Sequence, residues 1–303
     1  MFSITAYQQQ WLTQSPVRRA VIWSILSGAL FSVMSMLVKS SGQNLPTMQV
    51  VFGRSLFGLL LILPWILYYS PRAVFVTERW RLQFVRCLIG VAAMSCTFYA
   101  LSRLPLVDVT AINYSKPIFI LLLAAVFLRE RVTTIQWALT MIGFIGILIV
   151  LRPLPETFDA NYLVAVLAAV LVAFAITIVK ELTNSETPFS VLAWFSLLST
   201  IFTAPFALWH WQAPDFWQWV ELAMTGFFGI VAQFCVIRSY ALAPASYLAP
   251  LGYINILFTG SLGFLVFGDV PDVISILGAI IIMASTFYLM RRKKSPPEID
   301  SVT

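Results

Sequence analysis

Long apolar runs, separated by short polar segments, fill almost the whole chain. A helix that crosses about 30 Å of hydrocarbon needs about 20 mostly apolar residues. Runs of this length predict ten membrane-spanning helices, at Ala20–Val38, Met48–Tyr69, Leu82–Leu101, Val109–Leu128, Ile135–Leu151, Tyr162–Val179, Phe189–Trp209, Trp219–Ile237, Tyr247–Phe267 and Val273–Met290. The third and eighth runs are the weakest, because Arg86 and Glu221 lie near their ends. The short connections predict antiparallel neighbours and leave no room for a soluble domain.

The two halves of the chain resemble each other at an offset of about 140 residues. Equivalent positions pair Lys39 with Lys180, Pro46 with Pro188, Pro64 with Pro205, Tyr99-Ala100-Leu101 with Tyr240-Ala241-Leu242, and Glu130 with Asp269. A repeat of five helices is odd, so the second copy must enter the membrane from the opposite face. Inverted repeats of this kind are typical of transporters, because two similar halves can exchange conformations around a central site. The fold class is therefore an all-α integral membrane protein of ten helices in two inverted five-helix repeats.

Composition and charge fit this class. The 303 residues are 60% hydrophobic and 11% charged, against about 25% charged residues in a soluble domain. With the N-terminus inside, fourteen Lys and Arg residues fall on the inner side and three on the outer side. Because cytoplasmic loops retain basic residues, both termini are expected in the cytoplasm and the protein in the inner membrane. The net charge of +6 thus indicates orientation in the membrane and not a nucleic-acid partner.

These patterns predict four regions along the chain. Residues 1–19 form a cytoplasmic N-terminal segment, 20–152 the first repeat, 161–290 the second repeat, and 291–303 a basic, disordered cytoplasmic tail. We expect a small-molecule substrate and the lipid bilayer as partners, and we leave a homodimer open as the assembly.

Several short motifs resemble those of a known transporter family. They are Phe52-Gly53-Arg54, Ala111 to Pro117, Phe127-Leu128-Arg129-Glu130-Arg131, Ala249-Pro250-Leu251 and Phe267-Gly268-Asp269, with the repeated Tyr-Ala-Leu triplets. With these motifs the chain resembles the EamA-type, ten-helix branch of the drug/metabolite transporter superfamily, in which glycine is common at position 129 and Glu at position 269. The resemblance implies a metabolite carrier with a central cavity. Similar proteins include S-adenosylmethionine importers and amino-acid exporters.

Polar groups at membrane depth are the candidate substrate ligands. Their burial in hydrocarbon costs free energy, so they usually face an interior cavity. Lys116 lies seven residues into the fourth predicted helix, with Asn113 on the same face. Pro117 follows and predicts a kink that frees the carbonyl of Asn113. An ammonium, a free carbonyl and a kink would then converge on one docking point for a substrate carboxylate. Snorkelling of Lys116 to the interface is the alternative.

The remaining candidates come from both halves. Arg54, six residues into the second predicted helix, suits carboxylate recognition or gating, or else it reaches the outer interface. Asn255 is the repeat partner of Lys116, and for both Asn255 and Gln233 a hydrogen bond between helices is an equally good explanation. The aromatic candidates are Tyr114, for which core packing is the alternative, and Tyr253, near Asn255.

Two other classes of function compete with transport. An integral membrane enzyme would need metal ligands, an acid/base pair or an activated nucleophile. The single histidine, His210, lies in a predicted outer loop, and the sequence has no HExxH, CxxC or Walker motif. Neither a metal nor a cofactor is therefore expected. A membrane assembly subunit without transport activity is the other alternative, and the substrate, direction and coupling ion of transport stay open.

Overall fold

The computed structural model of the chain describes residues 14–42, 44–68, 74–104, 109, 112–151, 160–256 and 258. It also describes positions 277–278, 280–281, 283–284 and 288. Most of the predicted tenth helix, the second half of the ninth, residues 1–13 and the whole C-terminal tail lie outside the described residues.

Six helices of the described part are long and apolar enough to cross a membrane. They are α2 (Pro16–Ser41), α3 (Thr47–Tyr68), α5 (Trp80–Arg103), α9 (Asn161–Leu182), α10 (Pro188–Trp209) and α11 (Phe216–Leu242). These confirm six of the ten predicted spans, including the third and eighth, which looked weakest in the sequence. The full set of ten is not confirmed.

The predicted fourth and ninth spans differ from the structure. In place of one helix from Val109 to Leu128, the described residues are helical at 109 and 112–113, form a turn at 114–115, and then form the 11-residue helix α7 (Lys116–Val126). The ninth span begins as a short helix, α12 (Ala245–Leu248), and continues as the 3₁₀ helix η1 (Ala249–Ile254). Helix α8 (Thr134–Leu151) matches the fifth prediction. Proline near each interruption explains the difference, because it removes a backbone donor and restricts the residue before it.

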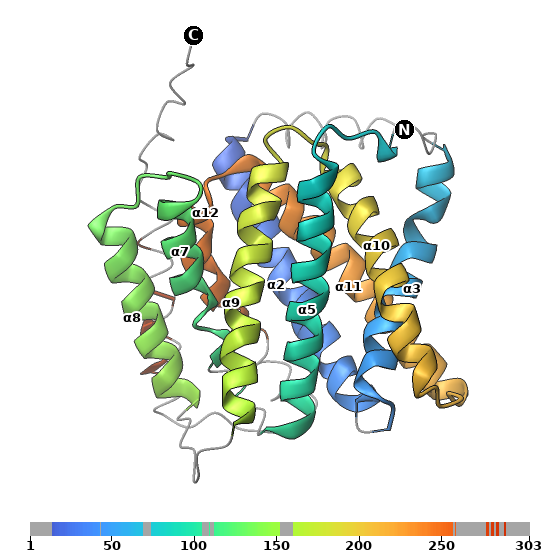
Figure 1. Cartoon of the computed structure of the whole chain (residues 1–303). Coiled ribbons are helices and arrows are strands. Elements are labelled where there is room, and N and C mark those ends of the chain that lie inside the picture. The colour runs from blue at the N-terminus through green and yellow to red at the C-terminus, as the bar shows by residue number, and fades with distance from the viewer. Residues whose placement is uncertain are drawn as a thin grey trace, which may run out of the picture.

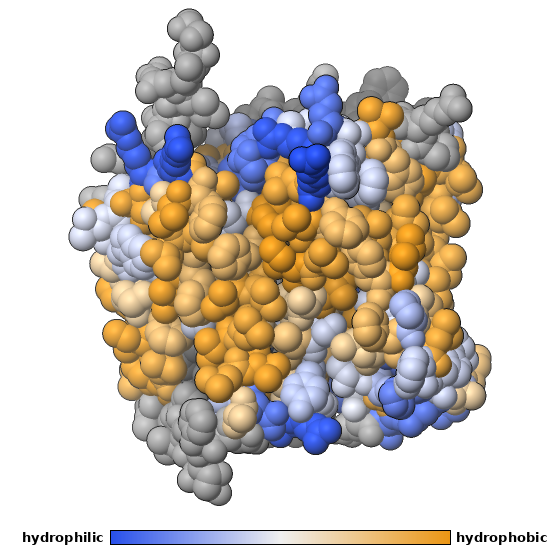
Figure 2. Space-filling model, viewed as in Figure 1, coloured by the Kyte–Doolittle hydropathy of each residue, from blue (hydrophilic) through white to orange (hydrophobic). Residues whose placement is uncertain are grey.

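The outer surface of the bundle carries a broad apolar belt between two polar rims (Figure 2). Large side chains such as Leu60, Trp65, Leu122 and Phe206 point outward in this belt and are exposed. An exposed apolar surface of this extent is a membrane-facing surface in a protein of this composition.

The two halves interlock in a pattern that exchanges the repeats. Helix α2 packs on α11, and the equivalent pair is α9 on α5. Helix α3 packs on its own equivalent, α10, and its contact with α11 matches the contact of α10 with α5. Figure 1 shows α2 descending and α9 ascending, so equivalent helices run in opposite directions. The described helices therefore have the symmetry that the five-helix repeat predicts.

Small residues allow these helices to approach closely. The face of α9 buried in the bundle is rich in alanine, at Ala165, Ala168, Ala169, Ala173 and Ala175. Gly226 of α11 lies so near α3 that a Cβ atom there would sit 2.5 Å from Cβ of Phe57. Membrane helices without a hydrophobic driving force between them rely on such close van der Waals packing.

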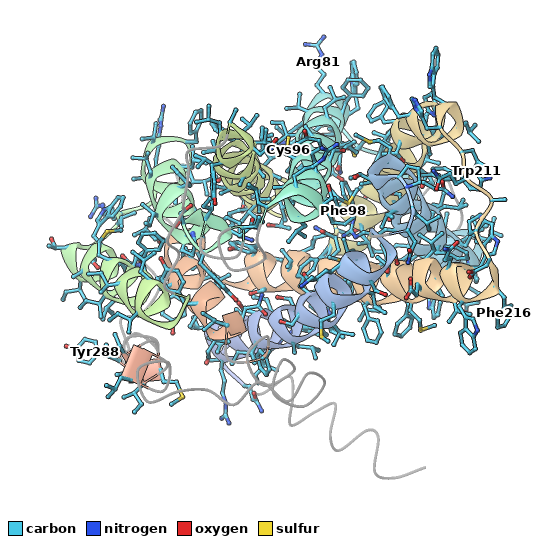
Figure 3. All side chains as sticks on the ribbon, turned by 90° about the horizontal axis from the view of Figure 1, so that it is seen from below. Arg81, Cys96, Phe98, Trp211, Phe216 and Tyr288 are labelled. Carbon is cyan, nitrogen blue, oxygen red and sulfur yellow. The ribbon has the colours of Figure 1, made fainter. Side chains whose placement is uncertain are left out.

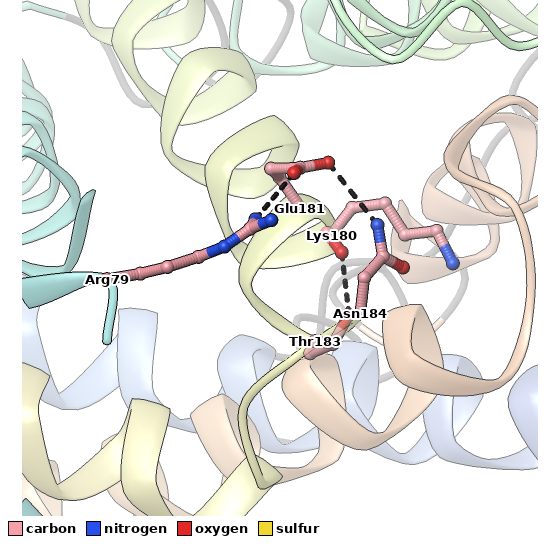
Figure 4. Close-up of polar contacts among 5 residues, drawn as sticks. All are labelled: Arg79, Lys180, Glu181, Thr183 and Asn184. Atoms are coloured by element: carbon pink, nitrogen blue, oxygen red, sulfur yellow. Dashed lines mark hydrogen bonds and ion pairs between the residues drawn. The ribbon is translucent and has the colours of Figure 1, made fainter. Parts of the chain in front are cut away.

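Polar contacts join the halves at the end of the bundle where α2 and α5 begin. Arg79 forms an ion pair with Glu181 at 2.6 Å, and Asn184 donates to the same carboxylate (Figure 4). The Lys180 ammonium donates to the carbonyl of Tyr240 at 3.0 Å. These contacts hold α5, α9 and α11 together at this end.

Glu130 also joins the two halves at this end of the bundle. Its carboxylate accepts from the backbone N–H groups of Ala245 and Ser246, at 2.9 and 2.8 Å. It thereby caps the first turn of α12, because it pairs the first two backbone donors of that helix. Arg129, just before it, has a φ of 53°, the left-handed region that glycine favours. This explains why glycine suits position 129 in the proteins that the chain resembles.

The substitution Gly226→Ala is expected to destabilise the bundle, because the new methyl group would push α3 and α11 apart at Phe57. Thermal unfolding in detergent measures this as a lower midpoint. Gly58→Ala on the facing helix is the matched control, since its Cβ would meet only ordinary contacts of 3.5 Å and more. Equal midpoints for the two variants would contradict close packing at Gly226.

The substitution Glu130→Gln is expected to reduce the free energy of unfolding by about 1.5–3 kcal/mol, the range for a hydrogen bond to a charged group. The amide has one acceptor oxygen and presents its NH₂ group to the second backbone donor. Glu78→Gln, at an exposed position of the same end of the bundle, serves as the control. An unchanged unfolding midpoint for Glu130→Gln would remove the capping role.

Candidate functional site

A small cavity lies between α3, α10 and α11 in the middle of the bundle. It has room for about one water molecule, ≈ 10 Å³, and is lined by Arg54, Ser55, Gly58, Phe195, Ser196, Ser199, Gly229, Ile230 and Gln233. This brings together two of the predicted ligands, Arg54 and Gln233, from different halves of the chain.

The cavity is built from equivalent positions of the two repeats. Arg54 and Phe195 are 141 residues apart, and so are Ser55 and Ser196. Gly58 and Ser199 differ by the same offset. Because α3 and α10 pack on each other, these positions face one another across the symmetry axis that relates the halves. Substrate sites of transporters with inverted repeats lie in such a place.

Arg54 does not reach the outer interface, which corrects one of its two predicted alternatives. Its side chain is only 8% exposed and donates from Nε to Sδ of Met34 at 3.2 Å and from Nη1 to Sδ of Met94 at 2.7 Å. Thioether sulfur is a weak acceptor. The guanidinium therefore retains most of its hydrogen-bonding capacity for another partner.

Arg86 is a buried cation near this cavity that the sequence reasoning did not name as a candidate. The sequence places it near the start of the third span among the inner basic residues, whereas the structure buries it to 3% exposure against α10. Its guanidinium lies 4.2 Å from the ring centroid of Phe195, which also lines the cavity. Its spacing from Gly90, one turn further on, was the available signal, because a glycine there leaves space for a bent-back side chain.

The other predicted ligands gather at a second place, where the two interrupted helices meet. A Cβ atom on Gly252 of η1 would lie 3.7 Å from Cγ of Pro117, so η1 packs on the start of α7. Lys116 is half-buried here and has no hydrogen-bond or ion-pair partner among the described residues. Oδ1 of Asn113, three residues before Lys116, and the hydroxyl of Tyr253 in η1 are buried without a hydrogen-bond partner among the described residues.

The geometry around Lys116 corrects the predicted kink. Lys116 begins α7 instead of lying seven residues inside a helix, and Pro117 takes one of the first two helical positions. Proline is tolerated there, because the N–H groups of the first turn have no partner within the helix. The convergence of Lys116 and Asn113 thus comes from a helix start and not from a bent helix.

The surroundings of Asn255 and Tyr114 fit the structural roles that were the alternatives for these two residues. The Ser32 hydroxyl of α2 donates to Oδ1 of Asn255 at 2.6 Å, which is the interhelical hydrogen bond expected as its alternative role. Tyr114 is buried. No set of three or more His, Cys, Asp or Glu residues that could hold a metal occurs in the described part of the chain.

A larger groove opens at the end of the bundle where α2 and α5 end. Its volume is ≈ 320 Å³, within the range of small-molecule pockets, and it is lined by Val38, Lys39, Gly42, Thr47, Val50, Phe98, Leu101 and Ser102. Viewed from this end, Phe98 lies inside the bundle, whereas Trp211 and Phe216 lie at its edge (Figure 3). Val50 and Phe98 also belong to an apolar cluster with Met34 and Met94, the two contacts of Arg54. The cluster therefore shares residues with the groove lining and contacts Arg54, which lines the central cavity.

Comparison with known proteins places these features in a family. The sequence profile of the EamA-like transporter family matches residues 18–152 and 160–291, the two halves of the chain. A solved crystal structure shares the fold with a TM-score of 0.77 at 17% identity, over 91% of this chain and 99% of the other.

Three curated relatives carry different substrates in their names. An S-adenosylmethionine uptake transporter of Rickettsia bellii is 28% identical over 90% of this chain and 93% of its own length. A pseudopaline exporter of Pseudomonas aeruginosa is 27% identical over 92% and 98%. A riboflavin transporter of Brucella anthropi is 31% identical over 82% and 89%. All three are transporters and none is an enzyme.

Proposed function

Because the chain belongs to the EamA-like transporter family, we propose that it is a secondary transporter that moves a small polar or amphipathic organic metabolite across the inner membrane by alternating access. The proposed substrate is amino-acid-like or S-adenosylmethionine-like. Both termini face the cytoplasm in this proposal, in line with the excess of Lys and Arg on one side of the predicted topology.

The observation that carries the proposal is the cavity between equivalent positions of α3 and α10. A site on the axis between two similar halves stays in place while the halves exchange their conformations around it. The cavity of ≈ 10 Å³ is too small for a metabolite, so α3, α10 and α11 are closed together in this conformation. Opening it requires movement of the apolar cluster beside Arg54.

Polar contacts join the halves at both ends of the bundle. At the end where α2 and α5 begin, these are the contacts of Glu130 and Lys180 and the Arg79–Glu181 ion pair. At the other end, Ser40 and Ser41 donate to Glu221, Gln49 bonds to Gln212, and the groove lined by Lys39 and Phe98 opens. In our proposal the substrate enters at one end while the contacts of the other end are intact. The next half of the cycle breaks these contacts.

Two observations favour Lys116 and its neighbours as part of the route. The interruptions at α7 and η1 fall on the fourth and ninth segments, which are equivalent in the two repeats. Irregular backbone at membrane depth is tolerated where it is buried in protein or lines a cavity. Lys116, Asn113, Tyr114, Tyr253 and Asn255 lie on these segments, and with Arg54 and Gln233 they are the proposed substrate-binding set.

The substitution Lys116→Ala is expected to reduce transport at least tenfold while the protein still inserts into the membrane. The physical reason is the loss of a half-buried ammonium that no described residue neutralises. Uptake of labelled metabolites into proteoliposomes measures the rate. Arg131→Ala is the control, because Arg131 is an exposed basic residue near the opposite end of α7.

The same assay separates the proposal from the reading as an assembly subunit. A transporter gives saturable flux of at least one metabolite, and an assembly subunit gives none. Unchanged kinetics in Lys116→Ala, with saturable flux in the unmodified protein, would return Lys116 to a packing or snorkelling role.

A further inference from the structure

Two arginines are held inside the bundle by glycines on α5 and α11, the equivalent helices of the two repeats. A Cβ atom on Gly229 of α11 would lie 2.7 Å from Nε of Arg54. A Cβ atom on Gly90 of α5 would lie 2.4 Å from Nη1 of Arg86. Gly90 and Gly229 are 139 residues apart, two fewer than the offset of 141 that relates Tyr99 to Tyr240 on the same helices. Each guanidinium therefore occupies a space that only the absence of a side chain provides.

Neither arginine has a neutralising partner. The only ion pair among the described residues joins Arg79 and Glu181, far along the chain from both. Nε and Nη1 of Arg86 are buried and donate to no described residue, and Arg54 donates only to the two methionine sulfurs. Both side chains lie beside Phe195, because Arg54 lines the central cavity together with it and Arg86 lies over its ring.

A structural role does not account for this arrangement. Arginines that hold a membrane bundle together pair with acids or with backbone carbonyls, and arginines near helix ends extend to the interface. Arg54 and Arg86 do neither. Met34, Met94 and the ring of Phe195 fix the positions of the two guanidinium groups but do not neutralise their charges.

We propose that Arg54 and Arg86 together bind the carboxylate groups of an anionic metabolite. The planar guanidinium fork matches a carboxylate with two parallel hydrogen bonds, and the ring of Phe195 orients the plane of Arg86. Ser196, Ser199 and Gln233 add neutral hydrogen-bonding groups to the cavity wall. The groove at the end where α2 and α5 end has Lys39 in its lining and no acidic residue.

This inference rests on the proposed transport function and narrows its substrate class. A bound carboxylate supplies a negative counter-charge for the two arginines. A sulfonium or ammonium cation without a carboxylate is repelled by their positive charges. Within the proposed range, the site favours di- and tricarboxylates and acidic amino acids. It disfavours substrates with a net positive charge.

The test measures binding of succinate, citrate and glutamate to the purified full-length protein, by calorimetry and by the shift of the thermal unfolding midpoint in detergent. Lysine and S-adenosylmethionine serve as comparison ligands. We expect at least one of the carboxylates to bind and to raise the midpoint. We expect Arg54→Gln and Arg86→Gln each to weaken that binding at least tenfold, and Arg86→Lys to restore part of it.

Arg103→Gln is the matched control, because Arg103 also lies over an aromatic ring, 5.6 Å from the centroid of Tyr99, but is exposed at the end of α5. Its binding should equal that of the unmodified protein. Without ligand, Arg86→Gln and the apolar Arg86→Met should unfold at the same or a higher temperature, since they remove an unpaired buried charge. A structural arginine would give lower midpoints instead.

The inference is overturned if none of the three carboxylates binds, or if they bind Arg54→Gln and Arg86→Gln as tightly as the unmodified protein. Flux measurements in proteoliposomes keep this failure apart from that of the transport proposal. Saturable flux of a cation without carboxylate binding would retain transport and reject the arginine site. Arginine-dependent carboxylate binding without any saturable flux would do the reverse.

Discussion

The burial of two uncompensated guanidinium groups is the constraint on which the interior of this bundle depends. Removing an ion from water costs several kcal/mol even after relaxation, and apolar surroundings provide no interaction that offsets this cost. The interior accommodates Arg54 with methionine sulfurs and Arg86 with an aromatic face, which are weak but polarisable contacts. Glycines on the packed helices provide the space. Such an arrangement is stable only because close packing elsewhere, as between α9 and α5, supplies enough free energy to offset it.

Unpaired backbone groups impose a similar constraint where α7 and η1 meet. In hydrocarbon every backbone N–H and C=O needs a partner, so a span is normally one uninterrupted helix. The fourth and ninth segments depart from this rule at α7 and at η1, and they pack on each other where they do so. The freed groups are then shielded by protein. The interrupted segments and the arginine cavity thus form two polar regions in an otherwise apolar interior, and both are made by corresponding parts of the two repeats.

Hydropathy alone predicted the six long helices, because a run of about 20 apolar residues has few other stable structures in a chain of this composition. The offset of about 140 residues predicted the interlocked halves, since equivalent helices must make equivalent contacts. The interruptions escaped prediction: a window of hydropathy counts Val109 to Leu128 as one span, and it cannot tell a proline at a helix start from one at a kink. Arg86 escaped because its charge near a predicted helix end looks like a loop residue. Gly90, one turn further on, is a weak signal in the sequence, whereas the contact with Phe195 shows the burial directly.

The symmetry of the halves does not extend to their side chains, and this difference carries the chemistry. Arg54 is equivalent to Phe195, Gln233 is equivalent to Ala92, and Lys116 is equivalent to Asn255. Similar backbones permit the two halves to exchange conformations, which is what alternation requires. Unequal side chains give the centre a charged wall and an aromatic wall, so an asymmetric metabolite can bind there in one orientation only. Family membership therefore accounts for the movement, whereas the choice of substrate depends on a few positions at which the repeats have diverged. Relatives with one fold can for this reason carry names as different as riboflavin and S-adenosylmethionine.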